Sequence, residues 1–151
     1  MSVCKRLMVA VALAFLVAGA GMGQGKAPEE SMKALKDAIM SSSAKDGVKA
    51  FAVEKLLPLC VNAVFVAEVE KQNILKVSLD EIKKIDKQWM EAEDELPIQK
   101  EKMTNACAQE LKRIAKEFPA IAEAFVMDNQ GANVGMSRLT SDYWQGDEPK
   151  W

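Results

Sequence analysis

One short segment near the C-terminus gathers the residue types best suited to binding a small molecule. Within Thr140 to Glu148, the chain's only tyrosine, Tyr143, precedes Trp144, and the acidic residue Asp147 follows three positions later. Aromatic rings offer rigid stacking surfaces, and a carboxylate beside them can hold an ammonium group. The segment is polar and contains glycine, so we expect a loop that forms one wall of a pocket for a small polar or charged ligand. The alternative is that both rings only anchor the loop.

The composition excludes most kinds of catalytic and metal site. The chain has no histidine, which removes the commonest general base and the commonest metal ligand. No glycine-rich nucleotide motif, P-loop or Cys-x-x-Cys-His haem motif occurs. The acidic stretch Glu91 to Glu95 is better explained as a solvated helix end than as a cation site. We therefore expect a protein that is not an enzyme and has no metal or cofactor.

The N-terminus has the three parts of a secretory signal peptide: the basic pair Lys5-Arg6, the apolar stretch Leu7 to Val17, and the small residues Ala18-Gly19-Ala20. We predict a signal peptide over residues 1–20 and a linker over 21–29. The apolar stretch is shorter than the roughly 20 residues of a membrane span, although an uncleaved anchor remains the alternative. The mature chain is then periplasmic or secreted in a bacterium, with no stable membrane span.

The charge of the chain makes nucleic acid an unsuitable partner. The formal net charge is −2, and lysine and arginine form no stripe along the sequence. A mildly acidic surface does not attract phosphate backbones.

Two cysteines, Cys60 and Cys107, remain after the predicted cleavage. An oxidising compartment allows them to form a disulfide, which would contribute roughly 4 kcal/mol by closing a long loop. The alternative is two separate buried thiols that pack as small apolar side chains. The sequence leaves both open.

Residues 30 to 118 carry mainly helical patterns. Five helices are expected, and the first three are one around Met32, Leu35 and Ile39, one from Phe51 to Leu57 that Pro58 ends, and one after Asn62 with Val64, Phe65 and Val69. The fourth follows the capping box Ser78 to Glu81 and has Leu79, Ile82, Ile85 and Trp89 on one face. The fifth runs from Pro97 to about Glu117, and its inner face carries Cys107, Leu111, Ile114 and Phe118. Lys45-Asp46-Gly47 is predicted to break the chain between the first two. Trp89 is expected in the core.

The pattern changes to that of a β-hairpin after residue 123. Ala124 to Met127 is a short apolar run, Asp128 to Gly131 is a turn in which Gly131 supplies positive φ, and Ala132 to Met136 alternates. The first strand is apolar on both faces and is predicted to be central, while the second has one apolar face. Two strands alone are marginal in water. Either the hairpin lies on the helices as a minimal sheet, or further strands follow, which we favour.

The same region resembles a known family. The stretch "FVMDNQGANVGM" with the later "TSDYWQGDE" resembles the PDC sensor domains, which are PAS-like, single Cache-type extracytoplasmic sensors of bacteria. The preceding "VSLDEIKKIDKQWMEAEDE" and "NACAQELKRIAKEFPAIAEAF" look like the helical part of that group. The resemblance extends from about Leu56 to the end, so residues 30–151 are predicted to be the N-terminal part of one such domain.

The resemblance implies an α+β fold in which helices precede the first hairpin of an antiparallel PAS/Cache-like sheet, here incomplete. It also implies a non-enzymatic, exported domain that binds a small molecule and reports to a signalling partner protein. It carries over Tyr143, Trp144 and Asp147 as candidate residues of the ligand pocket. Because only the first hairpin and no output module are present, we expect a truncated sequence or a free-standing secreted sensor. The competing expectation is a helical periplasmic structural or protein-interaction module with the hairpin as a docking edge.

Overall fold

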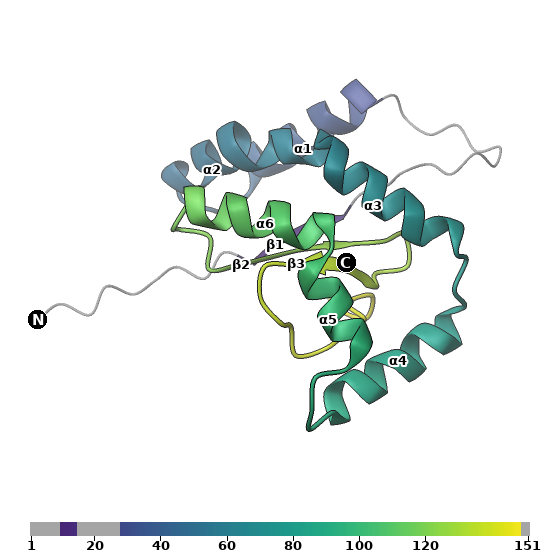
Figure 1. Cartoon of the computed structure of the whole chain (residues 1–151). Coiled ribbons are helices and arrows are strands. Elements are labelled where there is room, and N and C mark those ends of the chain that lie inside the picture. Colours follow the sequence, from purple (N-terminus) through teal and green to yellow (C-terminus); the bar gives the residue numbers. More distant parts are fainter. Residues whose placement is uncertain (1–9, 15–27, 149–151) are drawn as a thin grey trace, which may run out of the picture. The chain divides into compact units, whose positions relative to one another are not determined.

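The computed structural model describes residues 10–14 and 28–148 (Figure 1). These residues fall into two compact units. The described residues of one unit are 28–63, and those of the other are 10–14 with 64–148. Each unit is described by itself. Most of the predicted signal peptide and linker lies outside the described residues, so both stay predictions.

The unit of residues 28–63 is helical. It contains α1 (Pro28–Ser41), α2 (Asp46–Phe51), a π-helical turn (Ala52–Leu56) and a 3-10 turn (Leu57–Val61). The first predicted helix is confirmed, and Pro58 lies in the first turn of the 3-10 segment, where its missing N–H has no cost. The break predicted at Lys45-Asp46-Gly47 is the start of α2, and Asp46 lies in its first turn, where the helix dipole favours an acid.

In the second unit, α3 (Ala63–Ile74) and α4 (Leu79–Glu91) form where helices are expected. The hydroxyl of Ser78 accepts a hydrogen bond from the Glu81 amide at 3.3 Å, as an N-cap does. Ile82 and Trp89 are buried on the face that packs against the hairpin. Leu79, which the sequence places on the same face, is 40% exposed. Leu79 is the first helical residue, and the packed face begins with Ile82, one turn later.

The long helix predicted from Pro97 to Glu117 is two helices, α5 (Pro97–Thr104) and α6 (Ala106–Glu117). Asn105 separates them with an extended backbone, and its Oδ1 accepts a hydrogen bond from the Ala108 amide at 2.9 Å. Its Nδ2 donates to the Val134 carbonyl at 2.7 Å. An N-cap inside the apolar pattern therefore starts a new helix and fastens it to the sheet. The predicted inner face of α6 is otherwise confirmed, with Cys107, Leu111 and Ile114 buried.

The sheet has the order β1-β2-β3, with β1 at Ala10–Ala14, β2 at Glu123–Met127 and β3 at Asn133–Met136. The predicted hairpin is confirmed, and Gly131 in its turn has φ of 82°. A register shift between Val126 and Met127 leaves Val134 as an extra residue in β3, a β-bulge. The strand β2 is central, as predicted, because β1 pairs with it in parallel along its whole length. In the intact chain, part of the predicted signal peptide therefore forms an edge strand.

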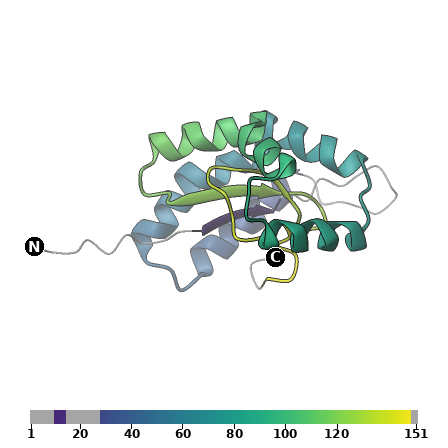
Figure 2. The same cartoon turned by 60° about the horizontal axis from the view of Figure 1, so that its bottom comes forward.

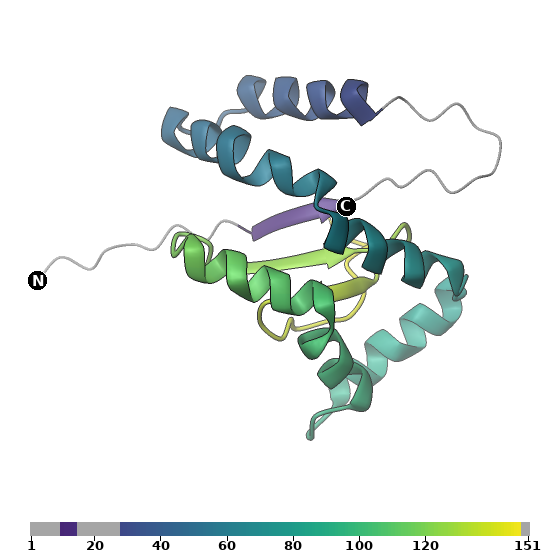
Figure 3. The same ribbon diagram turned by 45° about the horizontal axis from the view of Figure 1, so that its top comes forward.

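Both faces of the hairpin are covered. On one face, Phe125, Met127 and Met136 pack with Ile82 and Trp89 of α4. On the other, α6 runs along β2 and β3 (Figure 3). All four residues of β3 are buried, so the face of Asn133 and Gly135 is covered as well as the apolar one. The fold class is α+β, with helices preceding an antiparallel hairpin.

Gly135 is the point of closest approach between β3 and α6. A Cβ atom there would lie 2.7 Å from Cβ of Cys107 and 2.9 Å from the Ala108 nitrogen. Only glycine fits at this distance. At Gly47 of α2, by contrast, no atom lies within 4 Å of an added Cβ.

Replacing Gly135 with alanine is expected to lower the free energy of unfolding by about 1–3 kcal/mol, because the added methyl pushes α6 away from the sheet. The matched variant Gly47→Ala should raise it by about 0.5–1 kcal/mol, since alanine loses less entropy in a helix. Urea denaturation followed by circular dichroism measures both. Equal effects of the two substitutions would contradict the close packing of α6 on β3.

Candidate functional site

A buried polar network holds the hairpin turn in place. The carboxylate of Asp128 accepts hydrogen bonds through Oδ1 from the amides of Gln130 and Ala132, at 2.9 and 3.0 Å. Its Oδ2 accepts from Nε2 of Gln72 on α3 at 2.8 Å. Lys102 of α5 in turn donates to Oε1 of Gln72 at 2.8 Å. Because Asp128 and Gln72 are both buried, each bond replaces one lost to water, and the turn is tied to two helices.

The predicted ligand loop pairs with the hairpin as a short additional ladder. The Asn133 amide donates to the Tyr143 carbonyl at 3.0 Å, and the Gln145 amide donates to the Gly131 carbonyl at 2.8 Å. These bonds make an antiparallel bridge between Ala132 and Trp144. The start of β3 is therefore flanked on its outer side by Tyr143 to Gln145.

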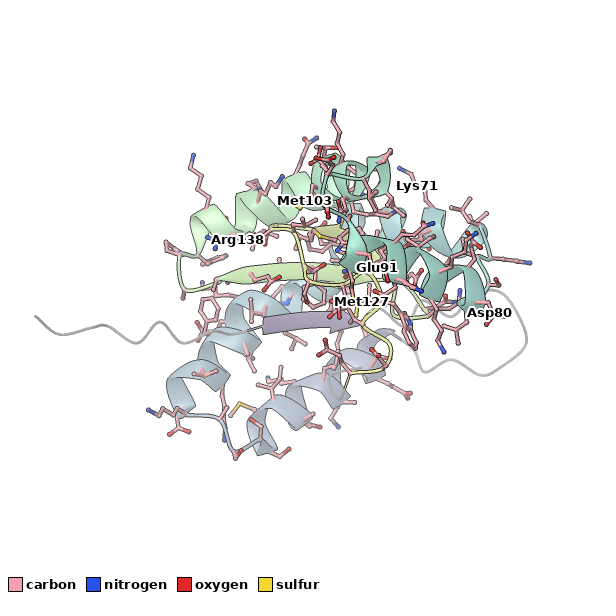
Figure 4. All side chains as sticks on the ribbon, turned by 90° about the horizontal axis from the view of Figure 1, so that it is seen from below. Lys71, Asp80, Glu91, Met103, Met127 and Arg138 are labelled. Carbon is pink, nitrogen blue, oxygen red and sulfur yellow. The ribbon has the colours of Figure 1, made fainter. Side chains whose placement is uncertain are left out.

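Helix α4 holds the loop from the other side through three side chains spaced three residues apart. Oδ1 of Asp86 accepts hydrogen bonds from the amides of both Tyr143 and Trp144, at 2.8 and 2.9 Å. The indole of Trp89 donates to the Thr140 carbonyl at 3.0 Å. Nζ of Lys83 lies 4.8 Å from the centroid of the Trp144 ring. Figure 2 shows α4 beside the yellow loop, and in Figure 4 Asp80 and Glu91 mark the two ends of the helix, with Met127 of β2 near it.

The side chain of Tyr143 is part of the core. The ring is 5% exposed and lies against Trp89, with 5.6 Å between ring centroids and 31° between ring planes. Burial raises the pKa of its hydroxyl well above the ordinary value, and the carboxylates of Asp128 and Glu101 add to the shift. Such a ring supports the loop and is not a free stacking surface.

Trp144 is half-buried, and its indole N–H donates to the Gln130 carbonyl at 2.7 Å. Gly146 allows this position, because a Cβ on Gly146 would lie 2.4 Å from the indole nitrogen. Asp147 is exposed, and its carboxylate makes no hydrogen bond or ion pair among the described residues. The structure thus brings Tyr143 and Trp144 together on one loop, one ring inward and one partly outward. The role of all three residues in ligand binding stays a prediction.

Asp86 and Lys83 are functional candidates that the sequence analysis missed. They lie on α4 with Trp89, at regular spacings of three residues, on a helix whose apolar face was easily recognised. A polar row beside an apolar face is the signal that could have identified them, because residues three apart share one side of a helix.

One buried polar atom in this region has no partner. Asn133 of β3 is fully buried; its Nδ2 donates to Oγ1 of Thr140 at 3.1 Å and to the Asp142 carbonyl at 3.2 Å. Its Oδ1 accepts no hydrogen bond, and it is the only such buried side-chain atom in the described part of the chain. An unpaired buried acceptor costs about 1–3 kcal/mol, so it marks a position where a donor is missing.

Cys60 and Cys107 are free thiols in the structure, half-buried and buried respectively, and they belong to different units. Burial raises the pKa of the Cys107 thiol from its ordinary value of 9.0 to about 12, and Glu68 adds to the shift while Lys102 opposes it. Their pairing stays a prediction.

An open hollow of about 360 Å³ lies elsewhere, at the end of α6 and the start of β2. Its wall includes the basic side chains of Lys112, Lys116 and Arg138, and Figure 4 shows where Arg138 lies. None of its lining residues belongs to Thr140–Glu148. The volume of this hollow therefore gives no reason to place a ligand at the predicted loop.

Comparisons with known proteins found no matching family model, no matching curated protein and no matching solved structure. Within residues 10–14 and 28–148, no single helix is long and apolar enough to cross a membrane; the bent pair Asp46–Val61 and Ala63–Ile74 meets the length and composition test only when taken together. In that same part of the chain, no group of three or more cysteine, aspartate or glutamate side chains is placed to hold a metal ion.

Substituting Asp86 with alanine is expected to lower the free energy of unfolding by about 2 kcal/mol, because two backbone amides lose a charged acceptor. The neighbouring variant Glu91→Ala, at the exposed end of the same helix, should change it by less than about 0.5 kcal/mol. Urea titration measures both. An Asp86→Ala protein as stable as Glu91→Ala would show that α4 does not hold the loop.

Stability is expected to fall as the pH rises above about 9. The folded state keeps the protons of Tyr143 and Cys107, whose pKa values are raised, while the unfolded chain releases them near pH 9 to 10. This contribution is fully present below that range and is lost at up to about 1.4 kcal/mol per pH unit for each group. Urea midpoints at pH 8 and pH 10.5 measure the loss, and Tyr143→Phe should show a smaller one. An equal loss in that variant would contradict the burial of Tyr143.

Proposed function

We propose that this chain is an exported, non-enzymatic domain of the PDC sensor, single Cache type, which senses a small polar or charged molecule through the loop Thr140–Gln145. The observation that supports it best is the unpaired Oδ1 of Asn133, next to this loop. The polar groups around it are otherwise paired: Thr140 donates to the Asp142 carbonyl at 2.6 Å, and Nε2 of Gln145 donates to the Asp142 carboxylate. An acceptor without a partner, inside a polar cluster that is otherwise paired, is a group that an N–H or O–H of a polar ligand would satisfy.

The route from ligand to response runs through α4. The loop contacts this helix at Asp86, Trp89 and Lys83. A ligand that favours one loop conformation therefore also favours the position of α4 that goes with it. A signalling partner protein would respond to that change.

The second candidate is a protein-interaction module, and an exposed apolar patch favours it. Ile74 and Leu75 at the end of α3 are 74% and 70% exposed, and Leu79 lies close by in sequence at the start of α4. Exposed apolar clusters of this kind mark contact surfaces. Sedimentation of the chain with and without the double variant Ile74→Ser, Leu75→Ser separates the two: a change in oligomeric state supports the module.

A thermal-shift screen with amines, amino acids, carboxylates and purines tests the sensing function. We expect at least one compound to raise the melting midpoint of the wild-type protein, and Asn133→Ala to lose that rise, because it lacks the acceptor. The exposed variant Leu139→Ala, at the neighbouring turn, should keep it. Each rise is measured against the variant's own midpoint, so that a stability change is not counted as lost binding. No response from any compound would overturn the proposal.

A further inference from the structure

The ring of Trp144 carries a cation supplied by the chain itself. Nζ of Lys83 lies 4.8 Å from the ring centroid, within the range of a cation–π contact. The ring cannot turn away easily, because its N–H is held by the Gln130 carbonyl and the backbone at Gly146 lies against its nitrogen edge. A fixed indole with an exposed lysine over it is a preformed surface for a positive charge.

Asp86 of α4 holds the backbone amide of Trp144 and has a second carboxylate oxygen. Oδ1 of Asp86 is occupied by the amides of Tyr143 and Trp144, but Oδ2 accepts no hydrogen bond from any described residue. Lys83 is one helical turn before Asp86, yet the two form no salt bridge within the described residues, although Glu81 and Lys84 of the same helix do at that spacing. The lysine therefore lies over the indole and leaves the acidic oxygen available.

We infer that Trp144 and Asp86 form a site for a small ammonium cation, and that Lys83 is its built-in competitor. The ligand's positive group would replace Nζ of Lys83 over the indole, and the oxygen Oδ2 of Asp86 would balance its charge or accept an N–H from it. This inference rests on the proposed function and names its ligand class. Lys83 would also set the concentration at which a free cation can bind. Its tethered amine has an effective concentration in the millimolar range, so a free cation must be present at a higher concentration or bind the site more tightly than the lysine does.

The competition makes a specific prediction about affinity. Removing the lysine amine should strengthen binding of a free cation by about three- to fivefold, the ratio that corresponds to one exposed cation–π contact. Lys84 provides the matched control, since it is the next residue on the same helix and lies 3.6 Å from Glu81 instead of over the ring. Lys83→Gln and Lys84→Gln change the net charge equally, so a difference between them is not a general electrostatic effect.

The experiment titrates tetramethylammonium chloride into the wild-type chain and both variants at constant ionic strength, with sodium chloride as the blank. The indole N–H signal of Trp144 in a proton–nitrogen NMR spectrum, assigned by its loss in Trp144→Phe, measures binding. We expect this signal to move in all three proteins, with a three- to fivefold lower Kd in Lys83→Gln only. Equal Kd values, or no movement in any of them, overturn the inference.

The two proposals fail in different ways. If a neutral or anionic compound from the thermal screen binds at the loop while tetramethylammonium moves no signal, the sensing function stands and the cation site falls. If Lys83→Gln binds the cation more tightly but no compound stabilises the wild-type protein, the site stands and its sensing role falls.

Discussion

The hairpin β2–β3 is buried on both faces, and this constraint determines the rest of the described unit. A backbone or side-chain polar group in such a place costs several kcal/mol unless a partner inside the protein satisfies it. The turn carboxylate of Asp128 is satisfied by two amides and by Gln72. The outer edge at the start of β3 is paired with the loop that carries Tyr143 and Trp144. The loop is therefore required by the sheet whether or not it binds a ligand.

The same constraint explains why α4 has two functions. Its apolar residues Ile82 and Trp89 cover one face of the hairpin, and its polar residue Asp86 satisfies two amides of the loop that closes it. Trp89 contributes to both, since its ring is in the core and its N–H bonds to the Thr140 carbonyl. A ligand that disturbs the loop must therefore disturb either the hydrogen bonds or the packing of α4. Among the buried side-chain nitrogen and oxygen atoms of the described residues, only Oδ1 of Asn133 has no hydrogen-bond partner, and Asn133 bonds to this loop through its Nδ2.

The hairpin, its turn glycine and the central position of β2 could be predicted, because apolar runs and turn residues are local signals. The division of α5 from α6 could have been predicted from Asn105 but was hidden by a continuous apolar pattern across it. The packing of Gly135 against Cys107, and the bonds from Asp86 to residues 57 and 58 positions later, could not. Such contacts depend on which elements meet in space, and a single sequence does not show that. For the same reason, Tyr143 and Trp144 were recognised as special by residue type, while their opposite orientations were not.

The account depends most directly on the loop being part of the folded core and not a mobile flap. Amide hydrogen exchange, followed by NMR under native conditions, measures this at single residues. The amides of Tyr143 and Trp144, which donate to Asp86, should exchange at rates close to that of Val126 in the centre of β2. The reason is that the hydrogen bonds of the loop and of the strand break only when the whole unit unfolds. Exchange at the rate of an unstructured peptide, while Val126 remains protected, would contradict the account.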